Sequence, residues 1–207
     1  MPSYSLNISI DPAGLKAIRA AGQKVTIAKP TRDGHPVAWV LFDPLESNTI
    51  TWDERYEVYA NTTSQQGIAT IETHPHKAAS AGNSYSLENG MFSDGEPNLG
   101  PTQYGVRNHD SSSVIDGVAM ITAGLYQSAL VNGNNSAGPL NAVPVLFDEH
   151  ATFEPTETIM IFLSNYGSTG TVLNNDSVEG NVLTVTYTSN PVANIKFNDA
   201  TNSFQLA

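Results

Sequence analysis

The sequence has no cysteine, few basic residues and no long apolar run. Without cysteine, the 207-residue chain can form no disulfide framework, thiolate metal site or cysteine nucleophile. Nine Lys and Arg against twenty Asp and Glu give a net charge of −11, which disfavours nucleic acid and anionic membranes as partners. No apolar stretch approaches the roughly 20 residues that a membrane helix needs. We therefore expect no nucleic-acid partner and no integral membrane segment.

Catalytic and targeting motifs are also missing. There is no Gly-x-Ser-x-Gly, Ser-x-x-Lys or His-Glu-x-x-His motif, and no glycine-rich phosphate loop. Residues 1–11 lack the basic start and apolar stretch of a secretory signal. We therefore expect a cytoplasmic protein that is not an enzyme.

The residues that are present are typical of a β protein. Charged residues make up only 14% of the chain, and segments 5–10 and 183–188 alternate apolar with polar positions, as half-buried strands do. One helix is expected over residues 12–21, because Asp11 can cap it, Pro12 fits its first turn and Gly22 can end it. The mixed periodicity of residues 114–125 makes a second helix there the main alternative.

An internal repeat is the most informative pattern. Val40-Leu41-Phe42-Asp43 recurs as Val145-Leu146-Phe147-Asp148, and flanking matches keep a similar spacing. We interpret residues 1–97 and 103–207 as two similar β repeats, joined by a linker at 98–102. The prediction is an all-β antiparallel sandwich, built from these two halves as one unit, with one short N-terminal helix.

The alternating positions also predict a core. Its expected members are Ile8, Ile10, Ile18, Val25, Ile27, Val40, Phe42, Val58, Ile68, Leu146, Ile161, Leu163, Val172, Leu183, Val185, Ile195 and Phe197.

Aromatic residues next to polar loops suggest a binding site. Trp39 precedes an apolar run and is expected in the core, whereas Trp52 lies between Thr51 and Asp53 and is expected at the rim. Trp52, Tyr56 and Tyr166 are therefore candidate ligand-binding residues. Aromatic rings beside Asn and Asp side chains suit a glycan, although a plain β-sandwich contains the same residues.

Lys29 is the candidate anchor for a covalent ligand. It continues the strand face of Val25 and Ile27, and burial at the end of an apolar face favours the neutral, nucleophilic amine. Such an amine can form an imine with a carbonyl-bearing small molecule. The alternative is a rim lysine whose amine reaches water.

Two acidic segments are candidate sites for Ca²⁺ or Mg²⁺, which prefer oxygen ligands. The candidate metal ligands are Asp94 and Glu96 in the first segment and Asp176 and Glu179 in the second. Ordinary turns use the same residue types for local hydrogen bonds.

A glycosidase is the enzymatic alternative. It needs two carboxyl groups about 5–9.5 Å apart across a cleft. The candidates are Asp53, Glu54 and Glu57, or Glu154 and Glu157.

The stretch from Ala17 to Asn61, including AIRAAGQKVTIAK and PVAWVLFDPLESNTITWDERYEVYAN, resembles cysteine-poor, signal-less β-rich proteins of fungi, of the mushroom fruiting-body lectin, toxin or chromoprotein type. The resemblance carries no site residues and implies a non-enzymatic binding protein. We predict binding of a small organic ligand, such as a pigment, or of a glycan. A lectin-like or toxin-like protein that acts by oligomerising, for example as a homodimer, is the alternative.

Overall fold

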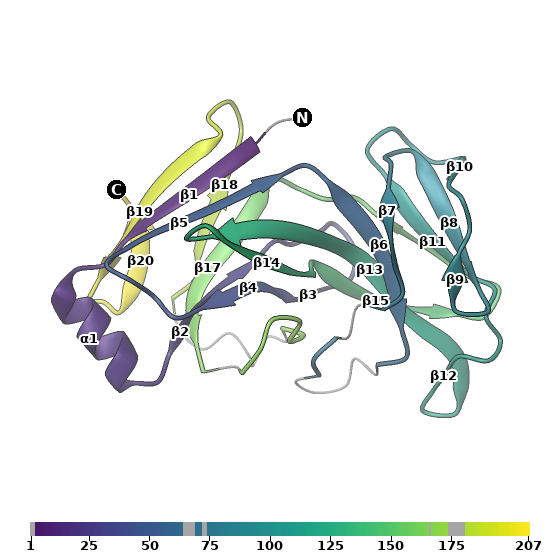
Figure 1. Cartoon of the computed structure of the whole chain (residues 1–207), viewed down its shortest axis with the longest axis horizontal. Coiled ribbons are helices and arrows are strands. Elements are labelled where there is room, and N and C mark those ends of the chain that lie inside the picture. Colours follow the sequence, from purple (N-terminus) through teal and green to yellow (C-terminus); the bar gives the residue numbers. More distant parts are fainter. Residues whose placement is uncertain (1–2, 64–68, 72–73, 166, 174–180) are drawn as a thin grey trace.

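The computed structural model describes residues 3–63, 69–71, 74–165, 167–173 and 181–207. Within these ranges the chain is built of β-strands with one helix, α1 (Pro12–Ala20), which confirms the predicted all-β fold and its short N-terminal helix. The helix lies at one end of the long axis, and strands β8 to β11 lie at the other end (Figure 1).

Helix α1 forms where the capping residues predict it. The Asp11 side chain accepts a hydrogen bond from the backbone N–H of Gly14 at 2.7 Å, and Pro12 occupies the first turn. Gly22 has φ +66° and donates its N–H to the carbonyl of Arg19, so a left-handed glycine ends the helix. Leu15 and Ile18 turn into the core.

The strands of the described residues form three sheets. The largest has 11 strands: β1 (Ser3–Ser9), β3 (His35–Pro36), β5 (Ser47–Asp53), β6 (Tyr56–Asn61), β7 (His76–Ala79), β12 (Val114–Ile115), β13 (Val118–Val131), β14 (Asn134–Pro139), β15 (Asn141–Leu146), β19 (Val192–Asn198) and β20 (Ser203–Leu206). The second has four: β2 (Lys24–Ala28), β4 (Ala38–Phe42), β17 (Thr158–Ser164) and β18 (Leu183–Thr186). The third has five: β8 (Asn83–Glu88), β9 (Met91–Phe92), β10 (Glu96–Pro97), β11 (Tyr104–Asn108) and β16 (His150–Phe153).

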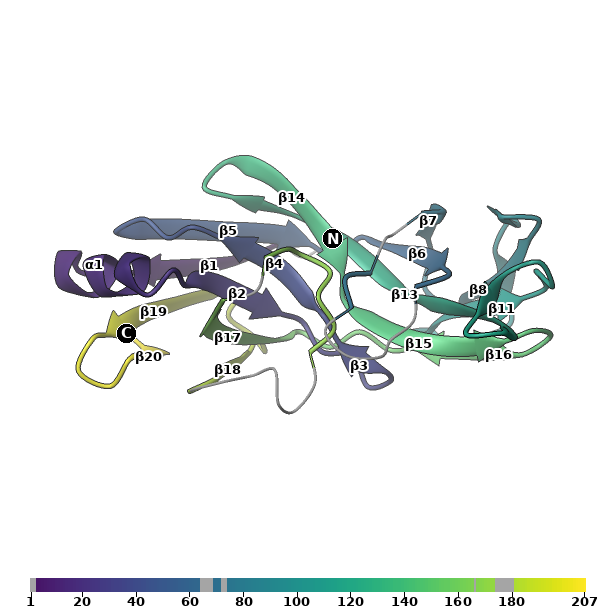
Figure 2. The same cartoon turned by 90° about the horizontal axis from the view of Figure 1, so that it is seen from below.

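The sheets are mixed rather than wholly antiparallel. Among the ladders of the described strands, β1 pairs with β19 and β8 with β11 in parallel, and the others are antiparallel. In the view from below, β5 and β14 lie on one side of the molecule and β17 and β18 on the other, as in a sandwich (Figure 2). The core lies between these layers.

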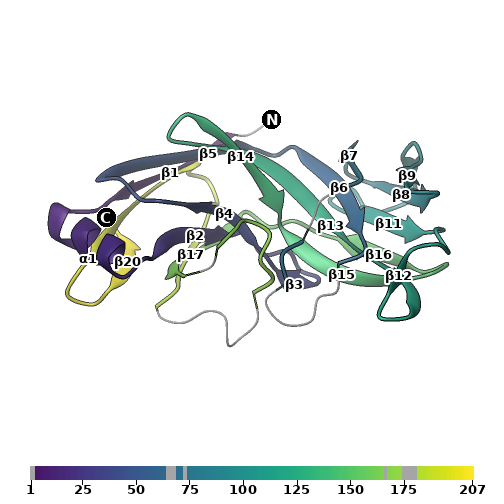
Figure 3. The ribbon, with the colours of Figure 1, turned by 60° about the horizontal axis from the view of Figure 1, so that its bottom comes forward.

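The two predicted repeat segments share sheets. Strand β2 pairs with β4 of its own segment and with β17 of the other, while β13 pairs with β15 of its own segment and with β5 and β6 of the other. The long strand β13 begins at the end of the molecule that carries β12 and runs towards the middle (Figure 3). The duplication itself stays a prediction.

The predicted core is buried with few exceptions. Leu146 is 50% exposed, so its assignment to the core is wrong. It pairs with Met120 on the outer face of β15, whereas its neighbour Val145 points inward. Phe42 and Leu183 are partly buried against the core, and Ile68 lies outside the described residues.

Candidate functional site

Lys29 follows strand β2 and carries an amine that is withdrawn from water. Its side chain is 0% exposed, so the alternative of a rim lysine that reaches water is wrong. The Nζ atom donates to Glu157 Oε1 at 2.9 Å, to Tyr56 Oη at 3.0 Å and to Gln127 Oε1 at 3.2 Å. An ammonium group has three N–H donors, and each of the three has an acceptor here. We call Lys29, Glu157, Tyr56 and Gln127 the lysine cluster.

The pairing of β2 with β17 brings the two charges of the cluster together. Ala28 lies opposite Met160, so the residues before β17 pass beside the residues after β2. The Thr156 hydroxyl donates to the carbonyl of Pro30 at 2.8 Å, which fixes this crossing next to Lys29 and Glu157.

Gln127 is oriented by the backbone around it. Its amide nitrogen donates to the carbonyl of Asp53 at 2.7 Å, which leaves the amide oxygen for the Lys29 amine. Its own carbonyl accepts a hydrogen bond from the indole N–H of Trp39 at 2.9 Å. The polar groups of the cluster are thus held from several strands.

Trp52 lies at the centre of an aromatic cluster beside Lys29. Its ring stacks on Tyr4 with 5.6 Å between centroids and meets Trp39 and Tyr187 edge-on at 5.5 and 5.3 Å. Trp52 is only 3% exposed, so the expected rim position of this residue is wrong. Alternation along β5 turns Trp52 to the same buried side as Ile50.

Tyr56 contacts the Lys29 amine and also lines a groove at the surface, which Lys29 itself does not line. The Lys29 Nζ lies 5.1 Å from the centroid of the Tyr56 ring and 5.9 Å from that of Trp52, within the range of a cation–π contact. The Tyr56 hydroxyl also donates to Glu157 Oε1 at 2.8 Å, and its ring meets Tyr104 edge-on. Tyr56 therefore contacts both charges of the pair.

Burial favours the neutral forms of Lys29 and Tyr56. It lowers the pKa of Lys29, and the carboxylate of Glu157 opposes this shift. Burial, together with the charge of Glu157, raises the pKa of Tyr56, so this phenol keeps its proton at pH values where an exposed tyrosine ionises. The site thus holds a protonated phenol beside an amine that loses its proton more easily than usual.

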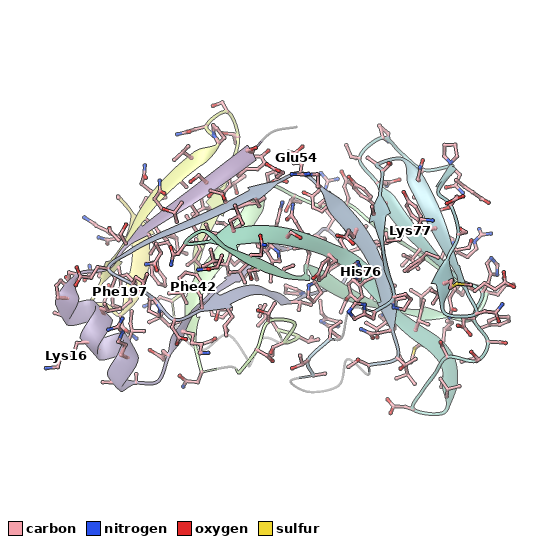
Figure 4. The ribbon with its side chains drawn as sticks, in the orientation of Figure 1. Lys16, Phe42, Glu54, His76, Lys77 and Phe197 are labelled. Atoms are coloured by element: carbon pink, nitrogen blue, oxygen red, sulfur yellow. The ribbon has the colours of Figure 1, made fainter. Side chains whose placement is uncertain are left out.

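The groove is lined in part by Trp52 and Tyr56 and has a volume of about 980 Å³. Small residues of β7 and β13, including Ala78, Ala79 and Ala129, form part of its wall. Two segments that border the groove can be found in Figure 4 by their labelled residues. They are the turn between β5 and β6, which carries Glu54, and strand β7, which carries His76 and Lys77. The space is large enough for a drug-sized molecule.

The carboxylates that line the groove are all engaged with neighbours. Asp53 pairs with Arg55 and accepts from the Ser3 hydroxyl at 2.5 Å, and these bonds lower its pKa. Glu54 accepts from the Tyr4 hydroxyl at 2.6 Å, and Glu57 contacts His76. Three carboxylates against the one guanidinium of Arg55 leave this lining negatively charged.

The two carboxylates of the second candidate glycosidase pair have different ion-pair partners. Glu154 pairs with the exposed Arg32 at 3.0 Å, whereas Glu157 pairs with the buried Lys29. The indole N–H of Trp52 also approaches Glu157 Oε2 at 3.5 Å.

Of the predicted metal ligands, Asp94 and Glu96 lie at the surface. Asp94 pairs with Lys77 at 2.9 Å, which lowers the pKa of its carboxyl, and Glu96 belongs to strand β10. Asp176 and Glu179 lie outside the described residues. Within the described part of the chain, no three His, Asp or Glu side chains are grouped closely enough to hold a metal ion.

The structure brings together three of the predicted ligand-binding residues, Lys29, Trp52 and Tyr56, and Tyr166 lies outside the described residues. Sequence reasoning missed Gln127 and assigned Glu157 only to a glycosidase pair. The two lie 98 and 128 residues from Lys29 along the chain, so no local pattern could have joined them to it.

No protein-family model matches the chain, and no significant match is found among the curated proteins or among the solved structures. The helix of the described residues is too short to cross a membrane.

Proposed function

We propose that this chain is a non-enzymatic binding protein that holds a small organic ligand in the groove beside the lysine cluster. The observation that carries the proposal is the groove itself. It has a volume of about 980 Å³, and two of its lining residues, Trp52 and Tyr56, belong to a buried network of aromatic and charged groups. A concave site with a few fixed polar groups is the usual form of a small-molecule site.

The orientation of the rings favours a small organic ligand over a glycan. Sugar binding by stacking needs an aromatic face that is open to solvent, but Trp52, Tyr56 and Tyr104 are each less than a tenth exposed. The buried rings and the small alanine side chains contribute apolar surface to the groove instead. A flat apolar molecule, such as a pigment, suits such a wall.

The first test is the absorption spectrum and intact mass of the protein purified from its natural source without denaturation. We expect a bound molecule that adds a defined mass or absorbs light beyond the tryptophan band. A protein that binds no small molecule but binds specific sugars on a glycan array would contradict the proposal.

A groove-blocking variant tests the location. Ala78 is exposed on β7 and lines the groove, so Ala78→Trp places a large ring in the groove without entering the core. The matched control is Ala200→Trp, which adds the same ring at an exposed position after β19. We expect Ala78→Trp to lose at least tenfold in ligand occupancy and Ala200→Trp to keep it. Equal occupancy in the two variants would place the ligand elsewhere.

A further inference from the structure

The amine of Lys29 differs from the other amines of the chain in its access to water. The sequence has five lysines, and Lys16 and Lys196 are exposed, while the side chains of Lys24 and Lys77 are about one third exposed. Only Lys29 is fully buried. A buried amine loses its proton more readily, and only the neutral amine is a nucleophile.

The amine also has a proton acceptor already in place. Glu157 Oε1 lies 2.9 Å from Nζ and also accepts from the Tyr56 hydroxyl at 2.8 Å. The side chain of Glu157 is 18% exposed, so this carboxylate connects the buried amine with solvent. A proton can therefore leave the amine along an existing hydrogen bond.

We propose that Lys29 forms an imine with the carbonyl group of the ligand in the groove, and that Glu157 serves first as proton acceptor and then as counter-charge. This inference rests on the proposed function, because the ligand must occupy the groove. Lys29 is buried and does not line the groove, whereas Tyr56 both lines the groove and contacts Nζ, so we expect access from the groove to require movement of the Tyr56 side chain.

The chemistry balances without a further reagent. Glu157 takes a proton from the ammonium group, the nitrogen lone pair attacks the carbonyl carbon, and a carbinolamine forms. The nitrogen passes one proton to the carbinolamine oxygen, and Glu157 returns its proton to the same oxygen. The carbon–oxygen bond then breaks, water leaves, and the nitrogen is left as a protonated imine beside the Glu157 carboxylate, which is ionised again. The sum is one aldehyde or ketone plus one ammonium group, giving one iminium group and one water, with the charge unchanged.

The charge of the groove narrows the ligand class. Asp53, Glu54 and Glu57 outnumber Arg55 among the lining residues, and the whole chain carries −11. An anionic carbonyl compound, such as a keto acid or a phosphorylated aldehyde, is repelled by this lining. We infer a neutral or cationic aldehyde or ketone.

The test is reductive labelling of the native protein with methyl 4-formylbenzoate, a neutral aldehyde, in the presence of cyanoborohydride, followed by peptide mapping. We expect Lys29 to be labelled at least fivefold faster than each of the four other lysines at neutral pH. This preference should vanish in guanidinium chloride, where all five lysines are exposed. Labelling of the surface lysines with Lys29 left unmodified would overturn the proposal.

Two comparisons of labelling rates distinguish a ligand-binding site at Lys29 from an amine that is reactive without such a site. The anionic analogue 4-formylbenzoate should label Lys29 at least fivefold more slowly than the ester, with equal rates at Lys196. Equal rates of the two probes at Lys29 would overturn the predicted ligand charge.

Ala78→Trp should slow labelling of Lys29 at least fivefold and leave labelling of Lys196 unchanged, whereas Ala200→Trp should change neither rate. An unchanged Lys29 rate in Ala78→Trp would overturn entry through the groove.

The natural ligand distinguishes this inference from the proposed function. A ligand that dissociates intact in acetonitrile after borohydride treatment, with Lys29 unmodified, would refute the imine and leave the binding function standing. A natively purified protein that carries no ligand would refute the binding function itself. A reduced adduct at Lys29 supports both.

Discussion

Two lysine–carboxylate pairs in this protein have the same length and opposite surroundings. Lys29 and Glu157 are 2.9 Å apart with side chains 0% and 18% exposed, and Lys77 and Asp94 are also 2.9 Å apart but lie at the surface. Water replaces a lost partner at the surface, whereas the Lys29 side chain is 0% exposed and its amine is not solvated in this way. The comparison shows that distance alone does not measure the contribution of an ion pair.

The largest effect is expected when the buried ammonium loses its carboxylate. Glu157→Gln keeps the shape of the side chain but leaves the charge of Lys29 uncompensated, and we expect a loss of about 2–4 kcal/mol in the free energy of unfolding. Urea unfolding followed by tryptophan fluorescence measures this change. A loss no larger than that of the surface variant Asp94→Asn would contradict the comparison.

Removing both charges of the buried pair should restore most of the lost stability. In Lys29→Met combined with Glu157→Gln, no buried charge is left unpaired, and we expect stability within about 1 kcal/mol of the wild type. A double-mutant cycle with the two single variants gives the coupling energy of the pair. Additive losses in the double variant would show that packing, not charge pairing, explains the first result.

A smaller effect is expected from pH. Burial lowers the pKa of Lys29 from its ordinary value of 10.5, and the Glu157 carboxylate opposes this shift. The unfolded chain therefore binds more protons than the folded one below pH 10.5, and stability gains from this group as the pH rises towards that value.

In Glu157→Gln the opposing carboxylate is absent, so stability should rise more steeply with pH and the penalty of the substitution should shrink. Urea midpoints of variant and wild type between about pH 7 and pH 9.5 measure the difference. The range ends there because burial raises the pKa of Tyr56 and Tyr104, whose folded forms keep their protons when the unfolded chain loses them. Parallel profiles of urea midpoint against pH for the two proteins would show that the titration of Lys29 does not cause the pH dependence.

The smallest effect is expected at the surface pair. Asp94→Asn removes a pair that is screened by water, and we expect no change in the urea midpoint beyond the error of the measurement. The same urea measurement, repeated with added salt, should show no further difference between this variant and the wild type. A clear loss of stability in this variant would mean that Asp94 has a structural role beyond its contact with Lys77.

The sequence predicts local features of this fold better than distant contacts. Helix α1 could be placed because its cap, its first-turn proline and its terminal glycine all lie within a few residues. Residues 114–125 were ambiguous because residues 121–125 of β13 are all buried, with strands on both of its edges, so they show no alternation of apolar and polar positions.

The candidate site shows the same limit. That Lys29 continues a buried face could be inferred from Val25 and Ile27, and the inward direction of Trp52 could have been inferred from its alternation with Ile50. The charge partner Glu157 could not be inferred, because the pairing of β2 with β17 that brings it close is not encoded in either strand alone.

The parallel pairing of β1 with β19 has a consequence for synthesis of the chain on the ribosome. Ser5 lies beside Val192, so β1 leaves the ribosome long before its neighbour exists. At about 5–20 residues per second, this delay lasts roughly 10–40 s. During that time β1 can pair only with β5, and its other edge stays open to foreign strands. Completion of the fold therefore waits for the last part of the chain to emerge.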